Sequence, residues 1–522
     1  MKNKKIFNLT IIILIIIICS IIFYYQTQKK GLHEDEGYTI ASSVNPDNGL
    51  MVAYPDNSIP DEGKPEWKTK DFVINYMSLS KDNYLNLKSV YVNQAFDNHP
   101  PFFYAMVHFA TIIFGGRFSM YSVFIVNIIG FVLSCYIIKK ILNTLNKENL
   151  IIPILIFYGL SMGTISMVLY QRTYMLLTFF ILLYFYYSIK IYQNKFTLDK
   201  KMIIKLGIAT VLGFLTQYFF AIYAFLICII MLIKMIKNRT EKKVVFKYVL
   251  IHLIYAVIGI LLFLPSIAHL LYSDRGISNL GNSEYFKHFI VYLKHLAFAF
   301  SLKDNLILIS TAAIAFIAGI IYLYKKDDKF VITLTSIPSI VYLFIVVKLT
   351  SFQELRYIMP MFPFISILLF LILDAVKIKY KNVILIAISI ILVTIGIITS
   401  EPRFLYKNYK EILDIANENQ EKSFIYIYDN FFNHMQSVPE MMIYSKTLIL
   451  NYNKGELDYL VNDENLVNED KVILSIKSYM DNDNIIKEIT DKTNFKNVEQ
   501  IYKAGTGNSQ NLVENNIYLL SK

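Results

Sequence analysis

Long apolar stretches separated by short polar connections make up the first 399 residues of the chain. A helix needs about 20 apolar residues to cross the roughly 30 Å hydrocarbon layer of a bilayer, and most of the stretches have that length. The pattern therefore predicts a polytopic α-helical membrane protein. The expected spans, about 11 in all, are residues 6–25, 118–138, 151–169, 173–192, 203–217, 219–236, 248–268, 306–324, 330–349, 358–376 and 382–399.

The stretch 203–236 is divided into two spans because 34 continuous helical residues would extend for about 50 Å at 1.5 Å each. The polar pair Thr216-Gln217 marks the expected break. Composition agrees with a membrane protein, since 55% of the residues are hydrophobic and 17% are charged, against roughly a quarter charged in soluble chains.

Basic residues distinguish the two sides of the expected bundle. The connections on one side and the N-terminus together hold 23 Lys and Arg residues, whereas the short connections on the other side hold only Arg172 and Arg356. The net charge of +11 therefore follows the positive-inside pattern and indicates no nucleic-acid partner. We expect a multi-pass protein of the plasma membrane, with a cytoplasmic N-terminus and residues 26–117, 269–305 and 400–522 outside.

The last 123 residues differ from the rest, with 13 Lys and Arg against 19 Asp and Glu. Short apolar runs at 424–428, 447–450 and 472–476 alternate with polar helical stretches, which predicts a small extracytoplasmic α/β domain. The expected division is a transmembrane domain, residues 1–399, that includes the outer loop 26–117, followed by a C-terminal domain, residues 400–522.

Two polar constellations mark the ends of the long outer loop. His33, Glu34, Asp35 and Glu36 follow the first span, and Asp97-Asn98-His99-Pro100-Pro101 precedes an apolar stretch of 13 residues that suits a surface helix. The double proline stiffens the backbone and can start a helix, which would fix Asp97 and His99 at its mouth. A charge run alone would favour an ordinary solvated loop, but the second constellation places carboxylates and a histidine at one membrane depth, which suits acid/base chemistry.

Arginine and tyrosine recur at two further outer junctions. Gln171-Arg172-Thr173-Tyr174 lies between two uncharged spans, and Arg356-Tyr357 precedes Pro360. A guanidinium presents a fork of donors that fits a phosphate, but an arginine at this depth can also extend to the lipid headgroups as an anchor. Both interpretations of Arg172 remain open from the sequence.

The order of these motifs resembles the GT-C glycosyltransferase superfamily, and most closely the bacterial relatives of protein O-mannosyltransferases and the lipid A aminoarabinose transferases. The resemblance covers roughly residues 1–400 and depends on the order and shared outer placement of the motifs. It implies that a sugar passes from a polyprenyl-phosphate donor to a glycan, lipid or protein acceptor outside the membrane, with inversion.

By that resemblance Asp35 is the general base, and Glu36 or Asp97 helps to position it. His99, Arg172, Tyr174, Arg356 and Tyr357 would form the substrate-binding side, with His99, Arg172 and Arg356 toward the lipid phosphate. The chain departs from the family at Gln217-Tyr218, where relatives often carry a His-Tyr pair. A phosphate leaving group needs no cofactor, and we expect none, although the carboxylates leave a divalent ion open.

A lipid-linked glycan flippase or transporter without transferase activity is the alternative function, because it would also need about a dozen spans. Such a protein more typically places charged residues along a path within its spans. A scaffold that displays the C-terminal domain would explain the topology but not the outer carboxylates. The clean spans favour the enzyme.

Overall fold

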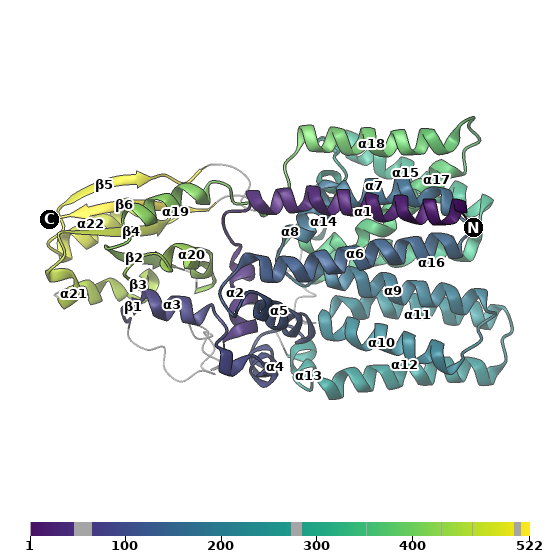
Figure 1. The fold of residues 1–522 in the computed structure, drawn as a ribbon, viewed down its shortest axis with the longest axis horizontal. Coiled ribbons are helices and arrows are strands. Elements are labelled where there is room, and N and C mark those ends of the chain that lie inside the picture. Colours follow the sequence, from purple (N-terminus) through teal and green to yellow (C-terminus); the bar gives the residue numbers. More distant parts are fainter. Residues whose placement is uncertain are drawn as a thin grey trace. The chain divides into compact units, whose positions relative to one another are not determined.

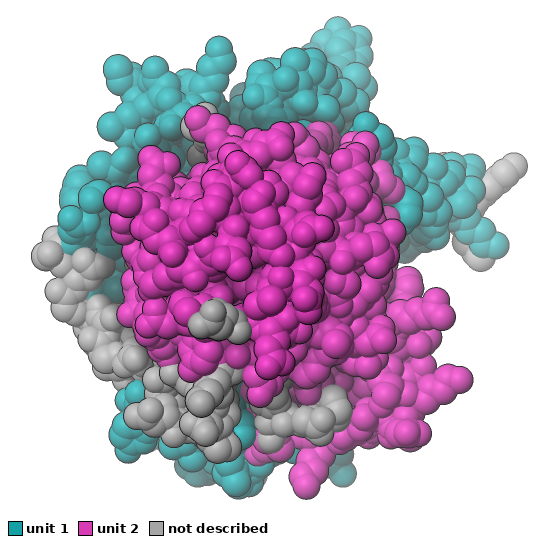
Figure 2. Space-filling model, turned by 90° about the vertical axis from the view of Figure 1, so that its left-hand side faces the viewer, with its two compact units in different colours: residues 1–24, 94–106, 124–402 teal, residues 25–93, 107–123, 403–522 magenta. Residues whose placement is uncertain are grey.

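A computed structural model describes residues 2–45, 65–272, 284–350, 352–429, 431–461, 463–505 and 513–522. Contacts divide the chain into two compact units (Figure 2). Unit 1 contains residues 1–24, 94–106 and 124–402, and unit 2 contains residues 25–93, 107–123 and 403–522. Unit 2 thus combines the C-terminal region with most of the segment between the first two long helices.

Unit 1 is built from helices that are apolar along most of their length (Figure 1). They are α1 (Lys2–Gln28), α6 (Met120–Thr144), α7 (Ile151–Leu160), α8 (Met162–Leu169), α9 (Tyr174–Gln193), α10 (Lys200–Thr216), α11 (Phe219–Lys237), α12 (Lys242–Leu262), α13 (Ser266–Leu271), α14 (Tyr285–Ala299), α15 (Leu306–Lys326), α16 (Lys329–Leu349), α17 (Phe362–Asp374) and α18 (Lys381–Thr399). Two short 3₁₀ segments, η2 (Glu148–Leu150) and η4 (Leu355–Met361), precede α7 and α17.

The predicted membrane helices are present, but their predicted number is not confirmed. Within the described part of the chain, nine helices are long and apolar enough to cross a membrane, or ten if α7 and α8 count as one span. The expected break in 203–236 occurs where predicted, because Gln217 is extended between α10 and α11. The resulting α10, at 17 residues, is shorter than the nine.

The predicted span 151–169 is broken in the middle. The chain bends by 59° between α7 and α8, and Ser161 at the bend has an extended backbone. Its hydroxyl accepts a hydrogen bond from the amide of Thr164 and so caps the start of α8. The hydropathy alone would favour one continuous helix through this position.

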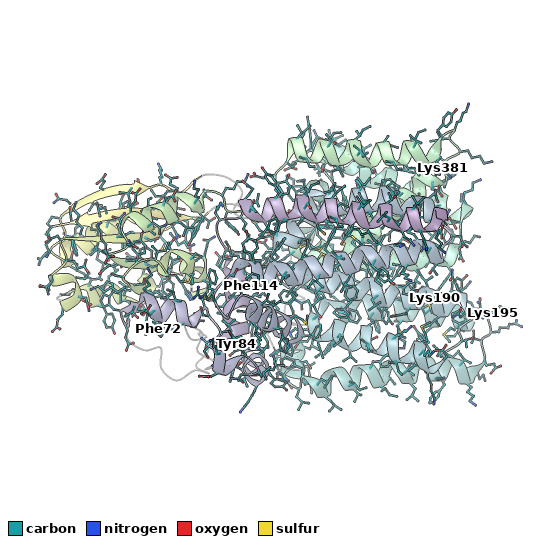
Figure 3. The ribbon with its side chains drawn as sticks, in the orientation of Figure 1. Phe72, Tyr84, Phe114, Lys190, Lys195 and Lys381 are labelled. Atoms are coloured by element: carbon teal, nitrogen blue, oxygen red, sulfur yellow. The ribbon has the colours of Figure 1, made fainter. Side chains whose placement is uncertain are left out.

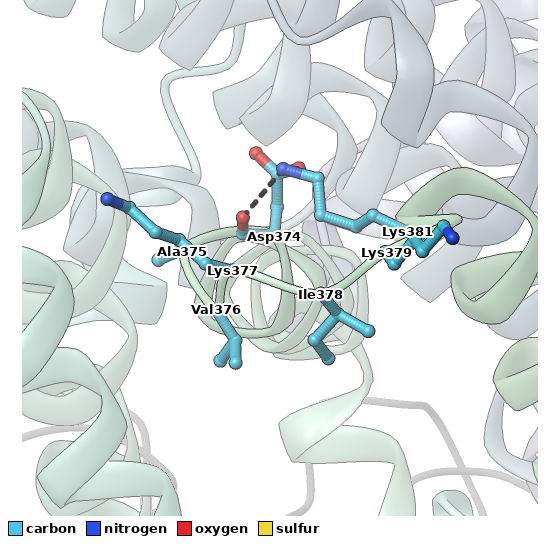
Figure 4. A pocket seen from close by; sticks show the side chains of 7 residues that line it. All are labelled: Asp374, Ala375, Val376, Lys377, Ile378, Lys379 and Lys381. Carbon is cyan, nitrogen blue, oxygen red and sulfur yellow. Dashed lines mark hydrogen bonds and ion pairs between the residues drawn. The ribbon is translucent and has the colours of Figure 1, made fainter.

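The basic connections gather at one end of unit 1, where Figure 3 labels Lys190, Lys195 and Lys381. Asp374 at the end of α17 forms an ion pair with Lys381 at 2.7 Å, and both side chains are drawn in Figure 4. It forms a second ion pair with Lys147 at 3.1 Å. These pairs join the connections that follow α6 and α17. The side-by-side arrangement of the basic connections agrees with the expected alternation of the spans.

Unit 2 contains a six-stranded mixed sheet with the order β1-β3-β2-β4-β6-β5. Its strands are β1 (Lys68–Thr69), β2 (Ser423–Tyr428), β3 (Lys446–Asn451), β4 (Lys471–Lys477), β5 (Asn497–Tyr502) and β6 (Asn515–Ser521). The three predicted strands form its parallel centre, β3-β2-β4, and these apolar strands are almost wholly buried. The α/β prediction is therefore confirmed, whereas the antiparallel strands β1, β5 and β6 were not predicted.

Helices of this part of the chain come from the C-terminal region and from the segment that follows α1. The C-terminal helices are α19 (Tyr409–Glu418), α20 (Val438–Met441), α21 (Glu464–Val467) and α22 (Asn482–Lys492), with 3₁₀ segments that include η5 (Phe431–Ser437). The earlier segment supplies α2 (Glu34–Val44), α3 (Lys70–Tyr76), α4 (Leu87–Phe96) and α5 (Phe102–Ile113). Helix α5 confirms the short apolar helix predicted after the double proline.

Candidate functional site

The predicted site residues belong to both units. Asp35 and Glu36 lie in unit 2, and the others, Asp97, His99, Arg172, Tyr174, Arg356 and Tyr357, lie in unit 1. The structure brings the members of each set together within their unit.

The acidic cap, residues His33 to Glu36, forms the first turn of α2 in unit 2. The Asp35 amide donates to His33 Nδ1 at 3.1 Å, and the His33 amide donates to Glu36 Oε2 at 2.8 Å. This reciprocal pair is a capping box, with histidine in the place that serine or threonine usually takes. Because His33 Nδ1 accepts a hydrogen bond, the ring proton of a neutral His33 lies on Nε2. The box therefore fixes the backbone under Asp35.

The carboxylates of the acidic cap differ in exposure. The side chains of Glu34 and Asp35 are 23% and 25% exposed, whereas Glu36 is wholly buried. Acidic groups in the first turn of a helix interact favourably with its amide dipoles. Asp35 is thus an accessible carboxylate on a fixed helical turn.

Glu36 is occupied by a buried ion pair. Lys29 Nζ lies 3.0 and 2.9 Å from the two carboxylate oxygens of Glu36 and also donates to the carbonyl of Phe404 at 2.6 Å. Burial lowers the pKa of Lys29, and the negative charge of Glu36 opposes that shift. Both ends of the lysine interaction lie in unit 2, so the pair ties the residues before α2 to the C-terminal region.

Helix α2 packs closely on that region. A Cβ atom added to Gly37 would lie 2.9 Å from the carbonyl oxygen of Met435, and one added to Gly31 would lie 2.9 Å from Tyr406 Cβ. The ring of Tyr38 meets that of His434 edge to face at 6.1 Å. The two glycines are therefore required by close approach, and the C-terminal region supports the turn that carries Asp35.

The second group begins with a chain of hydrogen bonds in unit 1, the Asp97–His99–Arg172 chain. Asp97 Oδ2 lies 2.9 Å from His99 Nδ1, and His99 Nε2 lies 2.9 Å from Arg172 Nη2. Arginine can only donate, so His99 Nε2 is the acceptor and Nδ1 carries the proton that is donated to Asp97. Arg172 Nη1 also donates to the hydroxyl of Tyr104 at 3.1 Å.

This chain is largely shielded from solvent. The side chains of Asp97 and His99 are 18% and 12% exposed, and Arg172 is 5% exposed. Burial alone would raise the pKa of Asp97, but the hydrogen bond from His99, the positive charge of Arg172 and the hydrogen bond from the Asn98 amide hold that pKa well below its usual range. Asp97 is therefore an anion whose charge is neutralised within the protein.

A further histidine holds the backbone just before Asp97. His269 Nε2 lies 3.1 Å from the carbonyl oxygen of Ala95, and His269 Nδ1 lies 2.9 Å from the hydroxyl of Tyr218. Both contacts give His269 a structural role. They also place the ring of His269 beside Tyr218, although the residue that precedes Tyr218 in the sequence is Gln217 and not a histidine.

The remaining predicted residues form the Arg356 group with one tyrosine that was not predicted. Arg356 donates to the hydroxyls of Tyr170, at 2.6 Å, and Tyr357, at 3.4 Å. Tyr174 stacks on Tyr170 with ring centroids 6.1 Å apart and meets Tyr357 edge to face at 6.3 Å. Arg356, Tyr357 and Tyr174 are thus brought together from two distant parts of the sequence.

One turn between α8 and α9 links the Asp97–His99–Arg172 chain with the Arg356 group. The amide of Arg172 donates to the carbonyl of Tyr170 at 2.7 Å, so the side chains of these two residues enter different groups from a tight turn. Sequence reasoning missed Tyr104 and Tyr170. The four-residue spacing of Tyr170 and Tyr174 was an available signal, but Tyr104 has none in a chain with 39 tyrosines.

Among the residues that the structure describes, no three His, Cys, Asp or Glu side chains are grouped so as to hold a metal ion. The described groups offer carboxylate, imidazole, guanidinium and phenol functions. These suit proton transfer and the binding of an anion.

Comparisons with known proteins give matches only among solved structures. No family model and no curated protein matches the chain. The crystal structure of ArnT from Cupriavidus metallidurans bound to undecaprenyl phosphate matches with a TM-score of 0.58 and 9% identity, covering 97% of both chains. ArnT is a lipid A aminoarabinose transferase. The chain therefore shares the fold of this ArnT.

The apo crystal structure of the same ArnT gives a TM-score of 0.54 at 10% identity, again over 97% of both chains. Because the match extends over nearly the whole chain, the shared fold includes the C-terminal sheet as well as the apolar helices. The predicted fold class is confirmed, and the roles of individual residues remain to be argued from their geometry.

Proposed function

We propose that the protein transfers a sugar from a polyprenyl-phosphate donor to an acceptor on the outer side of the plasma membrane, with inversion at the anomeric carbon. The observation that carries the proposal is the accessible carboxylate of Asp35 on a capped, closely supported helical turn in a chain with the ArnT fold. The donor class is supported by the undecaprenyl phosphate bound to that ArnT.

Asp35 is the general base in this proposal. It takes the proton of the acceptor hydroxyl or amine while the acceptor attacks the anomeric carbon and the bond to the carrier phosphate breaks. Asp35 is preferred to the other two acids because its carboxylate is 25% exposed, whereas Glu36 is buried against Lys29 and Asp97 is hydrogen-bonded to His99. Glu36 and Lys29 then position the turn without touching the substrate.

Arg172 and Arg356 are the proposed cations for the leaving phosphate. Both are held by tyrosine hydroxyls, and Arg172 is also held by His99, so little reorganisation is needed when negative charge develops on the phosphate. The burial of Arg172 supports this role over lipid anchoring, because an anchor would leave its guanidinium at the headgroups. Tyr174 and Tyr357 belong to the Arg356 group.

The proposal is tested in proteoliposomes with radiolabelled undecaprenyl-phosphate sugars and membrane extracts as the source of acceptor. We expect Asp35→Asn to lower transfer by a factor of about 10² or more, the usual range for a positioned base. Binding of undecaprenyl phosphate, measured by its effect on thermal unfolding, should stay near the parental value.

Glu34→Gln is the matched control, because Glu34 is a neighbouring acid of nearly equal exposure. It should transfer at close to the parental rate. Parental turnover by Asp35→Asn would contradict the assignment of the base. Movement of the lipid-linked sugar across the bilayer without any transfer, in parent and variant alike, would instead favour a transporter.

A further inference from the structure

A basic groove opens between three helices of unit 1, near the end of α9 that lies opposite Tyr174. It is a cavity of about 360 Å³ lined by the C-terminal parts of α6 and α9 and by the start of α10. Four lysines line it: Lys140, Lys190, Lys201 and Lys205. Three tyrosines, Tyr136, Tyr186 and Tyr187, lie among them.

The walls of the basic groove are held together by contacts outside it. Gln193 Nε2 donates to the carbonyl of Thr144 at 2.6 Å, which joins the ends of α9 and α6. The middle of α6 also lies close to the start of α9, because a Cβ added to Gly130 would lie 3.5 Å from the backbone of Leu176. Helix α10 packs along α9. The groove is thus a feature of packed helices.

The charge of the groove is strongly unbalanced. The four lysines face one acidic lining residue, Asp199, and its carboxylate already accepts a hydrogen bond from the Met202 amide as the N-cap of α10. Lysines at this spacing repel one another unless an anion lies between them. The groove therefore presents a concentrated positive site at the lysine-rich end of unit 1, where Figure 3 labels Lys190.

Apolar surface leads from the groove along the membrane-facing sides of two helices. On α6, Ile129, Val132, Leu133 and Tyr136 follow one face toward Lys140 and are 37 to 49% exposed. On α10, Ile204 and Ile208 are 60% and 51% exposed and share a face with Lys201 and Lys205. A positive pocket continuous with exposed apolar stripes matches the two parts of a phospholipid, an anionic headgroup and its acyl chains.

We propose that the basic groove binds the phosphate headgroup of an anionic diacyl phospholipid of the phosphatidylglycerol type, with its acyl chains along the exposed stripes of α6 and α10. Basic pockets between membrane helices recognise such headgroups by charge. The tyrosines supply hydroxyls and amphipathic rings at the depth where headgroups meet the hydrocarbon.

This site is distinct from the proposed donor site. Tyr174 begins α9 and Lys190 lies 16 residues later, which is about 24 Å along a helix. A donor phosphate near Arg172 and a phospholipid phosphate near Lys190 therefore occupy opposite ends of α9. The groove does not depend on the assignment of a reaction to this chain.

The test measures thermal unfolding of the full chain in a zwitterionic detergent with added dioleoyl phosphatidylglycerol, dioleoyl phosphatidylcholine or inorganic phosphate. We expect phosphatidylglycerol alone to raise the unfolding temperature of the parent, and native mass spectrometry to retain the same lipid. The double variant Lys190→Gln/Lys205→Gln should weaken this binding by a factor of roughly 5 for each lysine removed.

Two matched variants distinguish the groove from general basicity. Lys242→Gln/Lys243→Gln removes two exposed lysines at the start of α12, outside the groove, and should bind phosphatidylglycerol as the parent does. Lys190→Arg/Lys205→Arg keeps the charge and should also retain the lipid. Equal lipid shifts in the groove variant and the parent would overturn the proposal. Equal shifts with phosphatidylcholine or with inorganic phosphate would overturn it too, because they would assign the effect to acyl chains or to a free anion.

Discussion

The acidic cap and the Asp97–His99–Arg172 chain use similar residue types in opposite ways. In the cap, His33 accepts a hydrogen bond from the backbone of Asp35, and that carboxylate is left 25% exposed. In the chain, His99 donates to the carboxylate of Asp97 itself and accepts from Arg172. A histidine beside an aspartate therefore serves the backbone in one unit and the side chain in the other.

This difference decides which acid is available for chemistry. Asp97 has its proton affinity suppressed by its partners, so it is a poor acceptor of a substrate proton. In the cap, Glu36 pairs with the buried cation of Lys29, and the carboxylate of Asp35 stays accessible to solvent. Adjacent acidic residues in a sequence can thus have separate roles once one of them is paired with a buried lysine.

The largest expected effect comes from breaking the buried pair beneath the cap. Glu36→Gln leaves the Lys29 charge buried without its counter-ion, which typically costs about 3 to 5 kcal/mol. We expect a marked fall in the unfolding temperature. Thermal denaturation in detergent measures it. Lys29→Met/Glu36→Leu is the control, since removal of both charges should restore much of the stability. A single variant as stable as the parent would mean that the pair does not support the cap.

Arg172→Lys tests the cationic end of the Asp97–His99–Arg172 chain. Lysine keeps the charge but cannot donate to both His99 and Tyr104 in the same planar geometry, so transfer should fall by about 10², or about 3 kcal/mol of transition-state stabilisation. Rates of the Lys and Ala variants are compared at matched levels of inserted protein. A lysine variant with near-parental turnover would return Arg172 to the role of a membrane anchor.

Asp97→Asn should lower transfer less, by roughly tenfold, because it removes one charge-assisted hydrogen bond, worth about 1.5 to 3 kcal/mol. Because the pKa of Asp97 is lowered in the folded protein, the stabilisation by its negative charge is fully present above the ordinary aspartate range near pH 4. That stabilisation is lost only as the pH falls toward the lower pKa of the folded state. The difference in unfolding temperature between parent and variant should therefore be constant from pH 8 to pH 5 and shrink below about pH 4. A difference that changes between pH 6 and 8 would contradict the assigned ionisation.

The smallest effect is expected at His33, and this prediction distinguishes the role of His33 from that of His99. His33→Asn keeps an N-cap acceptor and should change stability by only a few tenths of a kcal/mol, whereas His33→Ala should cost about 1 kcal/mol. His99→Asn offers no ring to bridge Asp97 and Arg172 and should lose activity. The measurement is the ratio of transfer rates for the two asparagine variants. Equal losses would show that His33 does more than cap α2.

Sequence alone predicted what depends on local pattern. The membrane helices follow from hydropathy, and the three central strands follow from short apolar runs that are buried on both faces. Strand β5 escaped prediction because most of its residues are exposed and polar, and β1 because it has two residues. The broken span at Ser161 escaped because one cap outweighs an apolar pattern.

The candidate site was predicted in its members and less well in its contacts. Asp97, His99 and Arg172 were each proposed, but their mutual hydrogen bonds depend on residues 73 positions apart in the chain. Lys29 looked like an ordinary basic flank of the first span. Its burial depends on a partner carbonyl at Phe404, which no local pattern indicates.

The contact between Lys29 and Phe404 has a consequence for the biogenesis of the protein. The two residues are 375 positions apart, and synthesis at about 5 to 20 residues per second puts roughly 20 to 75 s between their emergence from the ribosome. During that interval α2 and β1 exist without the sheet that completes them. The turn that carries Asp35 can therefore mature only after the last membrane helix has been made, so a nascent chain interrupted before residue 404 would hold its helices but lack a finished cap.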